Sequence, residues 1–216
     1  MTFIEWLENE GGAAKVAITI KMYVENKPKR GPGSDKVNIG QYINQGAINK
    51  EFIDSEAAAI YRRLVKSTDK TTTGYFFSPF LKTEISKGDS TDETRPVAQA
   101  TVRDASVQKL LLEYIELNGP TPYRHSYAYQ KNKSAKDAVK YIRNLIKDEY
   151  KWIFDADLSK YFDTIPHNGL IRLIKTHFPN DPQLESLTFR YLKSYIRPSP
   201  KGFGNKAVRK LVGKSR

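Results

Sequence analysis

The sequence predicts an α+β protein with several packed helices and few strands. Three observations indicate this class: apolar residues recur at helical spacing in several segments, aromatic and β-branched residues gather in short ones, and polar turns separate the two kinds. With 216 residues, 39% of them apolar, the chain is long enough for one or two domains with a buried core.

The helices are predicted from apolar periodicity and capping residues. N-cap candidates are Asp54 or Ser55 for one helix, Asp104 for a second and Ser134 for a third, where Asp137 completes a capping box. The predicted helices cover residues 54–66, 105–117, a segment beginning at 134, 168–177 and 182–195. Residues 13–23 fit a helix or a strand, and the pattern does not decide between them.

The strands are predicted where aromatic and β-branched residues cluster. They cover residues 73–85, with Pro79 at an edge or bulge, 96–102 and 150–157. The polar residues 87–94 form a turn between the first two strands. Residues 25–35, rich in Pro, Gly and charge, form a flexible basic loop.

The charge balance indicates a polyanionic partner. The net charge is +12 and the pI is near 9.6. After Glu185 the chain has no acidic residue but nine Lys or Arg, which favours contact of the C-terminal tail with template or bound RNA. Both features have a simpler alternative, a solvated surface that keeps the protein in solution.

Several classes are excluded or disfavoured. The absence of cysteine excludes disulfides and thiolate metal sites, and His125, His167 and His177 lack metal-ligand spacing. No apolar run is long enough to span a membrane, and residues 1–11 are acidic rather than signal-like. We therefore expect a cytoplasmic protein without a membrane partner.

Two carboxylates end the third predicted strand. Alternation along a strand places Asp155 and Asp157 on one face, at the end of an apolar run. A hard cation such as Mg²⁺ would offset the cost of gathering carboxylates there. The alternative, which spacing alone favours, is that both acids lie in a solvated turn and cap the next element.

The surrounding residues, DADLSKYFDTIPH, resemble the first catalytic motif of bacterial reverse transcriptases related to those of group II introns. The resemblance implies that Asp157 binds the catalytic Mg²⁺ ions, with Mn²⁺ as an alternative ion, and that the backbone carbonyl of Leu158 assists. It also implies that Phe162 stacks under the sugar and selects deoxynucleotides. Asp155 matches a common but non-essential acid of the motif. The alternative for Phe162 is an ordinary core aromatic.

A second block, RPVAQATVRDASVQ at residues 95–108, resembles the arginine-led strand and helix of the same family, and residues 75–87 resemble its strand ending in a lysine. The match assigns Lys87 and Arg95 to the nucleotide triphosphate, with Lys82 as a weaker candidate, because cations neutralise phosphate. The alternative for each is a solvated surface cation. Ala105 departs from the pattern, which has Arg there.

A third block, SYAYQKNKSAKDA at residues 126–138, resembles the stretch that lies by template and nucleotide in the family, although Ala128, Gln130, Lys131 and Asn132 depart from it. Basic residues interleaved with Tyr123, Tyr127 and Tyr129 suit contacts to phosphate and base. The nucleic-acid-binding candidates are Arg124, Tyr127, Lys131 and Lys133. The alternative is a strand whose tyrosines face a core.

The resemblance covers about residues 29–195 and implies the fingers and a partial palm of a right-hand polymerase, with helices packed on a small antiparallel β-sheet. It divides the chain into an N-terminal extension at 1–51, fingers at 52–149, a partial palm at 150–197 and a basic tail at 198–216. The implied activity is RNA-directed DNA synthesis on an RNA template from a DNA or RNA primer, with deoxynucleoside triphosphates as substrates. The alternative is a non-catalytic RNA-binding module.

The family's Tyr-x-Asp-Asp motif, which supplies the other metal ligands, is not found after Asp157. Because paired metals need more than one carboxylate, this chain alone is expected to be inactive. A fragment of a longer enzyme, a split enzyme completed by a second polypeptide, and a degenerate module all remain open. So does the setting, which could be intron mobility, a retron, diversity generation or antiviral (antiphage) defence.

Overall fold

The computed structural model describes residues 1–26, 33–37, 39–44, 46–68, 72–86, 94–158 and 161–198. The α+β class is confirmed. The helices are α1 (Phe3–Asn9), α2 (Ala13–Glu25), α3 (Ile39–Tyr42), α4 (Lys50–Val65), α5 (Val102–Asn118), α6 (Ala135–Lys147), α7 (Tyr161–Thr164), α8 (His167–His177) and α9 (Pro182–Lys193). The strands are β1 (Ile43–Asn44), β2 (Ala47–Ile48), β3 (Phe80–Ser86), β4 (Thr94–Gln99) and β5 (Ile196–Pro198).

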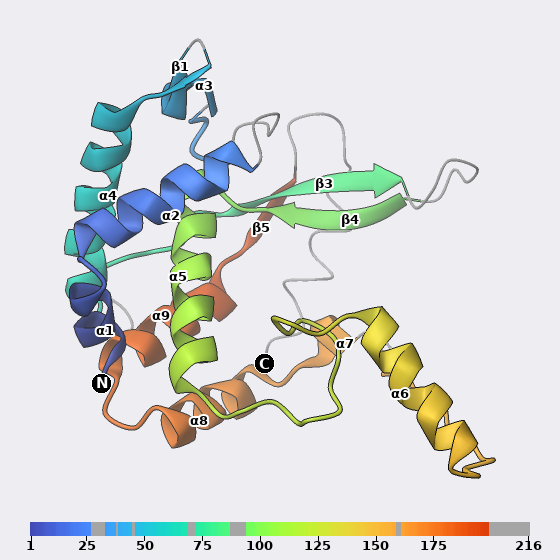
Figure 1. The fold of residues 1–216 in the computed structure, drawn as a ribbon. Helices are drawn as coiled ribbons and strands as arrows, with labels where there is room; N and C mark the ends of the chain where they lie inside the picture. The colour runs from blue at the N-terminus through green and yellow to red at the C-terminus, as the bar shows by residue number, and fades with distance from the viewer. Residues whose placement is uncertain are drawn as a thin grey trace.

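Helices α1, α2, α4, α5 and α9 form a body around one hydrophobic core (Figure 1). Asp181, the N-cap of α9, links three of them, because its carboxylate accepts hydrogen bonds from the Phe3 amide at 2.7 Å and the Tyr114 hydroxyl at 2.9 Å. The predicted N-terminal extension, fingers and partial palm thus all contribute to this core. The largest fully buried side chains include Tyr42, Tyr114, Phe3, Leu7, Ile20, Ile60, Leu110, Leu184 and Leu187.

Two helices show how the sequence pattern works and where it misleads. The ambiguous segment 13–23 is helical, since Val16, Ile20 and Val24 recur every fourth residue and are all fully buried in α2. Helix α4 begins earlier than predicted, and its N-cap is Asn49 rather than Asp54 or Ser55. The buried stripe of α4 begins at Ile53, one residue before the predicted start, so the helix was predicted too late because Asp54 and Ser55 were read as its cap.

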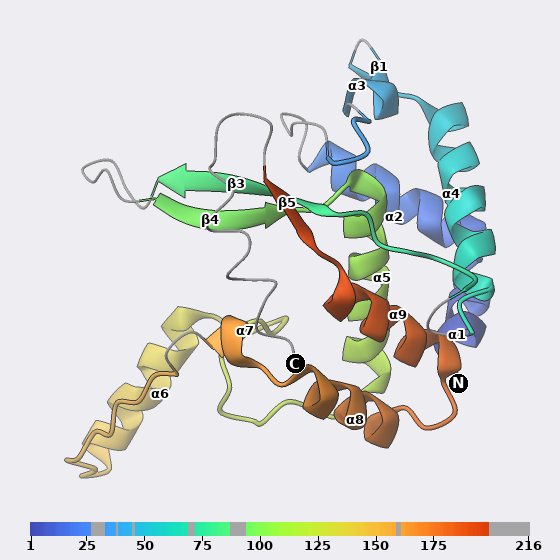
Figure 2. The ribbon, with the colours of Figure 1, turned by 180° about the vertical axis from the view of Figure 1, so that it is seen from behind.

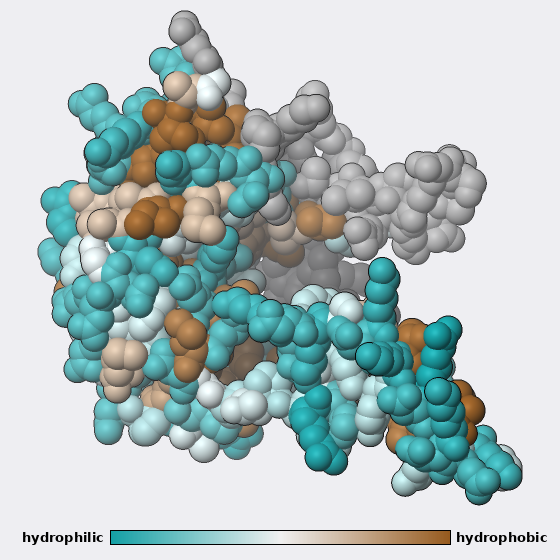
Figure 3. Space-filling view, in the orientation of Figure 1, coloured by the Kyte–Doolittle hydropathy of each residue, from teal (hydrophilic) through white to brown (hydrophobic). Residues whose placement is uncertain are grey.

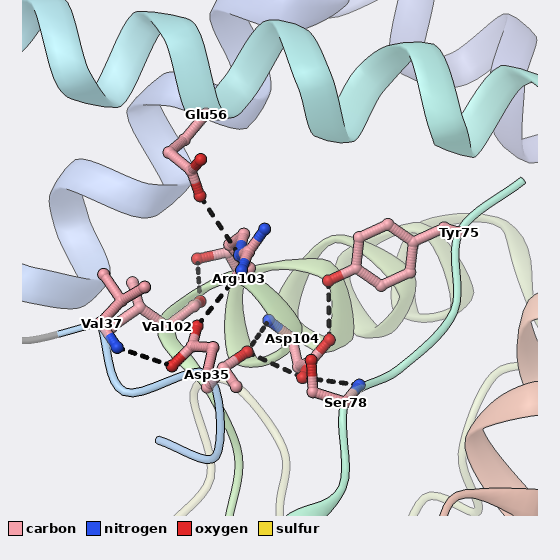
Figure 4. Close-up of polar contacts among 10 residues, drawn as sticks. Asp35, Val37, Glu56, Tyr75, Ser78, Val102, Arg103 and Asp104 are labelled. Carbon is pink, nitrogen blue, oxygen red and sulfur yellow. Dashed lines mark hydrogen bonds and ion pairs between the residues drawn. The ribbon is translucent and has the colours of Figure 1, made fainter. Parts of the chain in front are cut away.

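The N-cap of α5 is Thr101, and the predicted capping role of Asp104 is wrong. The Thr101 hydroxyl accepts a hydrogen bond from the Asp104 amide at 3.0 Å. The buried Asp104 carboxylate accepts from the hydroxyls of Tyr75 and Thr101, both at 2.7 Å, and from the Ser78 amide at 3.1 Å (Figure 4). Asp104 therefore fastens the segment before β3 to the start of α5.

The main sheet is three-stranded, in the order β4–β3–β5. Strands β3 and β4 form the predicted antiparallel hairpin, with Leu81 opposite Gln99 and Ser86 opposite Thr94, whereas β5 adds in parallel and was not predicted. The predicted strand at 73–85 begins only at Phe80. The amides of Tyr75 and Ser78 are bonded to the side chains of Ser67 and Asp104, so they are not available to a strand partner.

The predicted strand at 150–157 is absent; these residues have no regular secondary structure. Trp152, Ile153 and Phe154 are 96%, 81% and 93% exposed, so both faces of the segment are apolar and uncovered. Such a pattern is typical of an interior strand of a sheet. Within the described part of the chain no strand lies beside it, which is why it stays unpaired.

The β3–β4 hairpin and α6 both project from the same side of the helical body (Figures 1 and 2). Helix α6 extends furthest, and the capping box that begins it, Ser134 with Asp137, is as predicted. In the described ranges no helix combines the length and apolar character needed to cross a membrane.

Gly74 lies in the segment between α4 and β3, where the backbone leaves little room for a larger side chain. Gly74 has φ of +102°, and a Cβ there would lie 2.6 Å from Ser67 Cα. Gly74→Ala should lower the free energy of unfolding by about 2–4 kcal/mol through backbone strain and overpacking. Urea denaturation followed by circular dichroism measures this. Gly46→Ala is the matched control, because φ is +83° but no atom lies within 4 Å; it should lose about 1 kcal/mol. Equal losses would contradict the steric argument.

Candidate nucleic-acid and metal site

Residues 150–158 return along α6 toward α7 (Figure 2). Asp155 and Asp157 lie near the end of this extended segment, and both side chains are exposed. Among the described residues, no hydrogen bond or ion pair engages either carboxylate. Residues two apart on an extended chain are separated by about 6.6 Å, so both carboxylates can approach one ligand.

These two carboxylates are a partial ligand set for a cation. Carboxylate oxygen is the ligand type that Mg²⁺ takes, and exposure leaves both groups accessible. In the described part of the chain, however, three or more His, Cys, Asp or Glu do not gather at one point. The residues present therefore fit one side of a Mg²⁺ site, and any further ligands would have to come from outside the described residues.

An open hollow of about 650 Å³ begins next to Asp157. Leu158, which is 69% exposed, lies at one edge, and α7, α8 and the turn between them form the remainder. The lining is mainly apolar, with Tyr161, Ile165 and Leu173, and contains one guanidinium, that of Arg172. The hollow thus begins one residue after Asp157, and neither Asp155 nor Asp157 is among the residues that line it.

The predicted nucleotide-binding residues are only partly described. Lys87 lies outside the described residues, as do the side chains of Arg95 and Phe162. The backbone of Arg95 pairs with Ile85 in the hairpin, and Phe162 is in α7. Hairpin and α7 lie on the same side of the body in both ribbon views, which is compatible with a shared site (Figures 1 and 2). Lys82, the weaker candidate, is half-buried in β3 opposite Ala98.

The loop before α6 contains the four predicted nucleic-acid contacts, and its lysines already have protein partners. The Lys133 ammonium donates to the carbonyls of Arg124 at 2.6 Å and Ser126 at 2.9 Å, and lies 5.3 Å from the Tyr127 ring centre. Lys131 forms an ion pair with Glu116 at 3.2 Å. Lys133 therefore holds the loop in shape, whereas the Arg124 side chain is exposed.

Aromatic stacking attaches this loop to α6. The His125 ring stacks on the Tyr141 ring of α6, with ring centres 4.4 Å apart. The Tyr127 ring centre lies 6.2 Å from that of Tyr141. The neighbouring Tyr129 is 96% exposed and has φ of +57°, so its ring points into solvent. Sequence periodicity placed Tyr141 on the helix but gave no sign of its partner, because the contact depends on the loop conformation.

Comparison with known proteins gives three informative relatives, and no family model matches the chain. The chain is 30% identical over 131 residues to the putative COX1/OXI3 intron 2 protein of Saccharomyces cerevisiae, which covers 59% of the chain and 15% of that protein. It is 28% identical over 133 residues to the putative COX1/OXI3 intron 1 protein, which covers 61% of the chain and 16% of the yeast protein. Protein YkfC of Escherichia coli is 22% identical over 152 residues, covering 68% of the chain and 39% of YkfC.

The chain is a distant relative of yeast intron proteins. It spans only about one-sixth of the length of the two yeast proteins. Because two of the three relatives are yeast proteins and one is from E. coli, the comparison does not single out a bacterial family.

Proposed function

We propose that the chain is part of an RNA-directed DNA polymerase, and that Asp157 supplies one of its metal-binding carboxylates. The observation that carries the proposal is the position of Asp157, exposed and free of ion pairs within the described residues, near the end of an extended segment in which Asp155 lies two residues before it. The resemblance of its flanking residues to a reverse transcriptase motif and the similarity to yeast intron proteins support it.

Each predicted residue has a role in nucleotide transfer to a primer 3′ end. Asp157, the Leu158 carbonyl and, less directly, Asp155 would hold Mg²⁺. The bound ion would stabilise the negative charge that develops on the oxygens of the transferring phosphoryl group. Lys87 and Arg95 would orient the triphosphate by charge-assisted hydrogen bonds, and Phe162 would pack against the sugar.

A second candidate is a basic RNA-binding module without catalysis. The incomplete ligand set in the described residues favours it, together with the net charge of +12. In that case the exposed carboxylates would have no chemical role, and RNA binding would not depend on a divalent ion.

Metal-dependent primer extension separates the two candidates. The chain is assayed within the polypeptide or complex that supplies the remaining carboxylates, on an RNA template with an annealed DNA primer and deoxynucleoside triphosphates. We expect extension with Mg²⁺, its loss after chelation and its return when Mg²⁺ is restored, with RNA binding retained throughout. Absence of extension with either Mg²⁺ or Mn²⁺, alongside intact RNA binding, would favour the binding module.

A further inference from the structure

Helix α6 has a row of cations that runs along its whole length. Lys136, Lys140, Arg143 and Lys147 are spaced by four, three and four residues, so they fall within about 60° of the helix circumference. All four side chains are exposed. Within the described residues none of the four forms an ion pair. The row spans about 16 Å, at 1.5 Å per residue.

The other faces of α6 have a different character. Val139, Ile142 and Ile146 lie on an apolar face, where they are 49%, 48% and 57% exposed. Figure 3 shows hydrophilic side chains over the projecting α6 arm and apolar ones along its edge. The acidic residues Asp137 and Asp148 lie on the side of the cation row opposite the apolar face; the Asp137 carboxylate is bonded to Ser134 and is also attracted to Lys140, one turn further along. On a helix face that serves only solubility, acids and bases usually alternate.

We propose that this cation row is a binding track for an RNA phosphate backbone, separate from the carboxylate site. A row of about 16 Å equals the axial length of roughly five nucleotides of one strand in a duplex, at about 3.4 Å each, and an extended single strand spans it with fewer. The loop that stacks on Tyr141 through His125 lies against another face of α6, since Tyr141 is at least about 100° around the helix from each cation, so the loop leaves the row uncovered. Cations that follow a phosphate backbone supply the electrostatic part of single-stranded nucleic-acid binding.

An anionic lipid surface fits this helix less well. A helix lying on a membrane buries its apolar face, and cations at the borders of that face reach the headgroups. In α6 the cations follow one border only, while Asp137 and Asp148 lie toward the other, where they would meet the negative headgroups. RNA contacts one side of the helix and needs no such symmetry.

The inference does not depend on the proposed polymerase activity, because it is tested by binding in the absence of metal and nucleotide. The variant replaces Lys136, Lys140, Arg143 and Lys147 with Gln, which keeps helix propensity. The matched control replaces Lys50, Arg62, Arg63 and Lys66 of α4 and its C-cap with Gln, so the change in net charge is the same. Circular dichroism checks that both variants retain their helices.

The measurement is the affinity for a 20-nucleotide single-stranded RNA between 50 and 200 mM salt. At 50 mM salt we expect the α6 variant to bind at least about tenfold more weakly, with a plot of log affinity against log salt less steep by about 3, since each lost phosphate contact removes about 0.7. The α4 control should change the slope by less than about 1. A duplex RNA of the same length shows whether the row binds single-stranded or double-stranded RNA. For a duplex, the α6 variant should reduce the slope of log affinity against log salt by about 3.6, because each lost contact removes about 0.9.

Three outcomes would overturn the proposal. The first is an α6 variant with the affinity and salt slope of the unmodified chain on both RNAs. The second is an α4 control that loses as much as the α6 variant, which would mean that net charge alone matters. The third is an α6 variant that keeps RNA binding but loses binding to vesicles containing phosphatidylserine, which would assign the row to membranes.

Discussion

Asp157→Asn should reduce primer extension by at least about 1,000-fold and leave the affinity for RNA unchanged within about twofold. The substitution keeps the size of the side chain and removes the negative charge that a divalent ion requires. A bound metal ion contributes several kcal/mol to stabilising the transferring phosphoryl group, and about 4 kcal/mol corresponds to a thousandfold in rate. The residue is exposed, so the fold should tolerate the change.

Two matched carboxylates make this test specific. Asp155→Asn changes the other acid of the same segment and should reduce extension far less, since its resemblance to the family motif is weaker. Asp148→Asn changes an exposed acid at the C-cap of α6 and should leave extension unchanged. If Asp157→Asn kept a tenth or more of the activity, or if RNA binding fell in parallel with extension, a direct role in metal binding would lose its support.

The helices could be predicted because local signals and burial agree in them. Residues 168–177 and 182–195 correspond closely to α8 and α9, and Ser134 begins α6 as its capping box indicated. The N-caps of α4 and α5 were misplaced for a common reason. Asp54 and Asp104 are good capping residues by type, but in the fold the N-cap position belongs to Asn49 and Thr101, five and three residues earlier.

Strands were harder to predict because pairing is not a local property. The segment 150–157 has strand composition, yet no described strand lies beside it. Strand β5, in contrast, is three residues long and carries Pro198, so its parallel pairing with β3 could not be read from its composition.

For the candidate site, sequence reasoning identified the residues but not their surroundings. Asp157 is exposed because the segment 150–158 forms no strand, and the hollow that begins at Leu158 depends on how α7 and α8 are placed. The engagement of Lys133 by two backbone carbonyls depends on a loop in which Tyr129 and Asn132 have positive φ. Asn is among the residue types enriched at positive φ but Tyr is not, so the conformation at Tyr129 could not be read from its residue type.

Asp104, at the centre of a buried polar network, should be the position of the helical body least tolerant of substitution. Its carboxylate is 1% exposed and accepts three hydrogen bonds, from Tyr75, Ser78 and Thr101. Burial, reinforced by the nearby Asp104 carboxylate, raises the pKa of the Tyr75 hydroxyl well above its usual value, so this group stays protonated as a donor. Next to the network, Arg103 joins the loop at Asp35 to Glu56 of α4, with N–O distances of 3.5 and 3.2 Å (Figure 4).

Asp104→Ala should therefore lower the free energy of unfolding by about 3–5 kcal/mol, because it leaves the Tyr75 hydroxyl and the Ser78 amide buried without an acceptor. Tyr75→Phe removes one donor and leaves two hydrogen bonds, so its expected loss is about 1–2 kcal/mol. Asp54→Ala, an exposed acid on α4, should stay within about 0.5 kcal/mol of the unmodified chain. Urea denaturation at pH 7 ranks the three variants. The Arg190 guanidinium also holds the segment before β3, because it donates to the carbonyls of Thr73 and Tyr75. If Asp104→Ala lost no more stability than Tyr75→Phe, water would be replacing the carboxylate, and Arg190 rather than Asp104 would hold this segment.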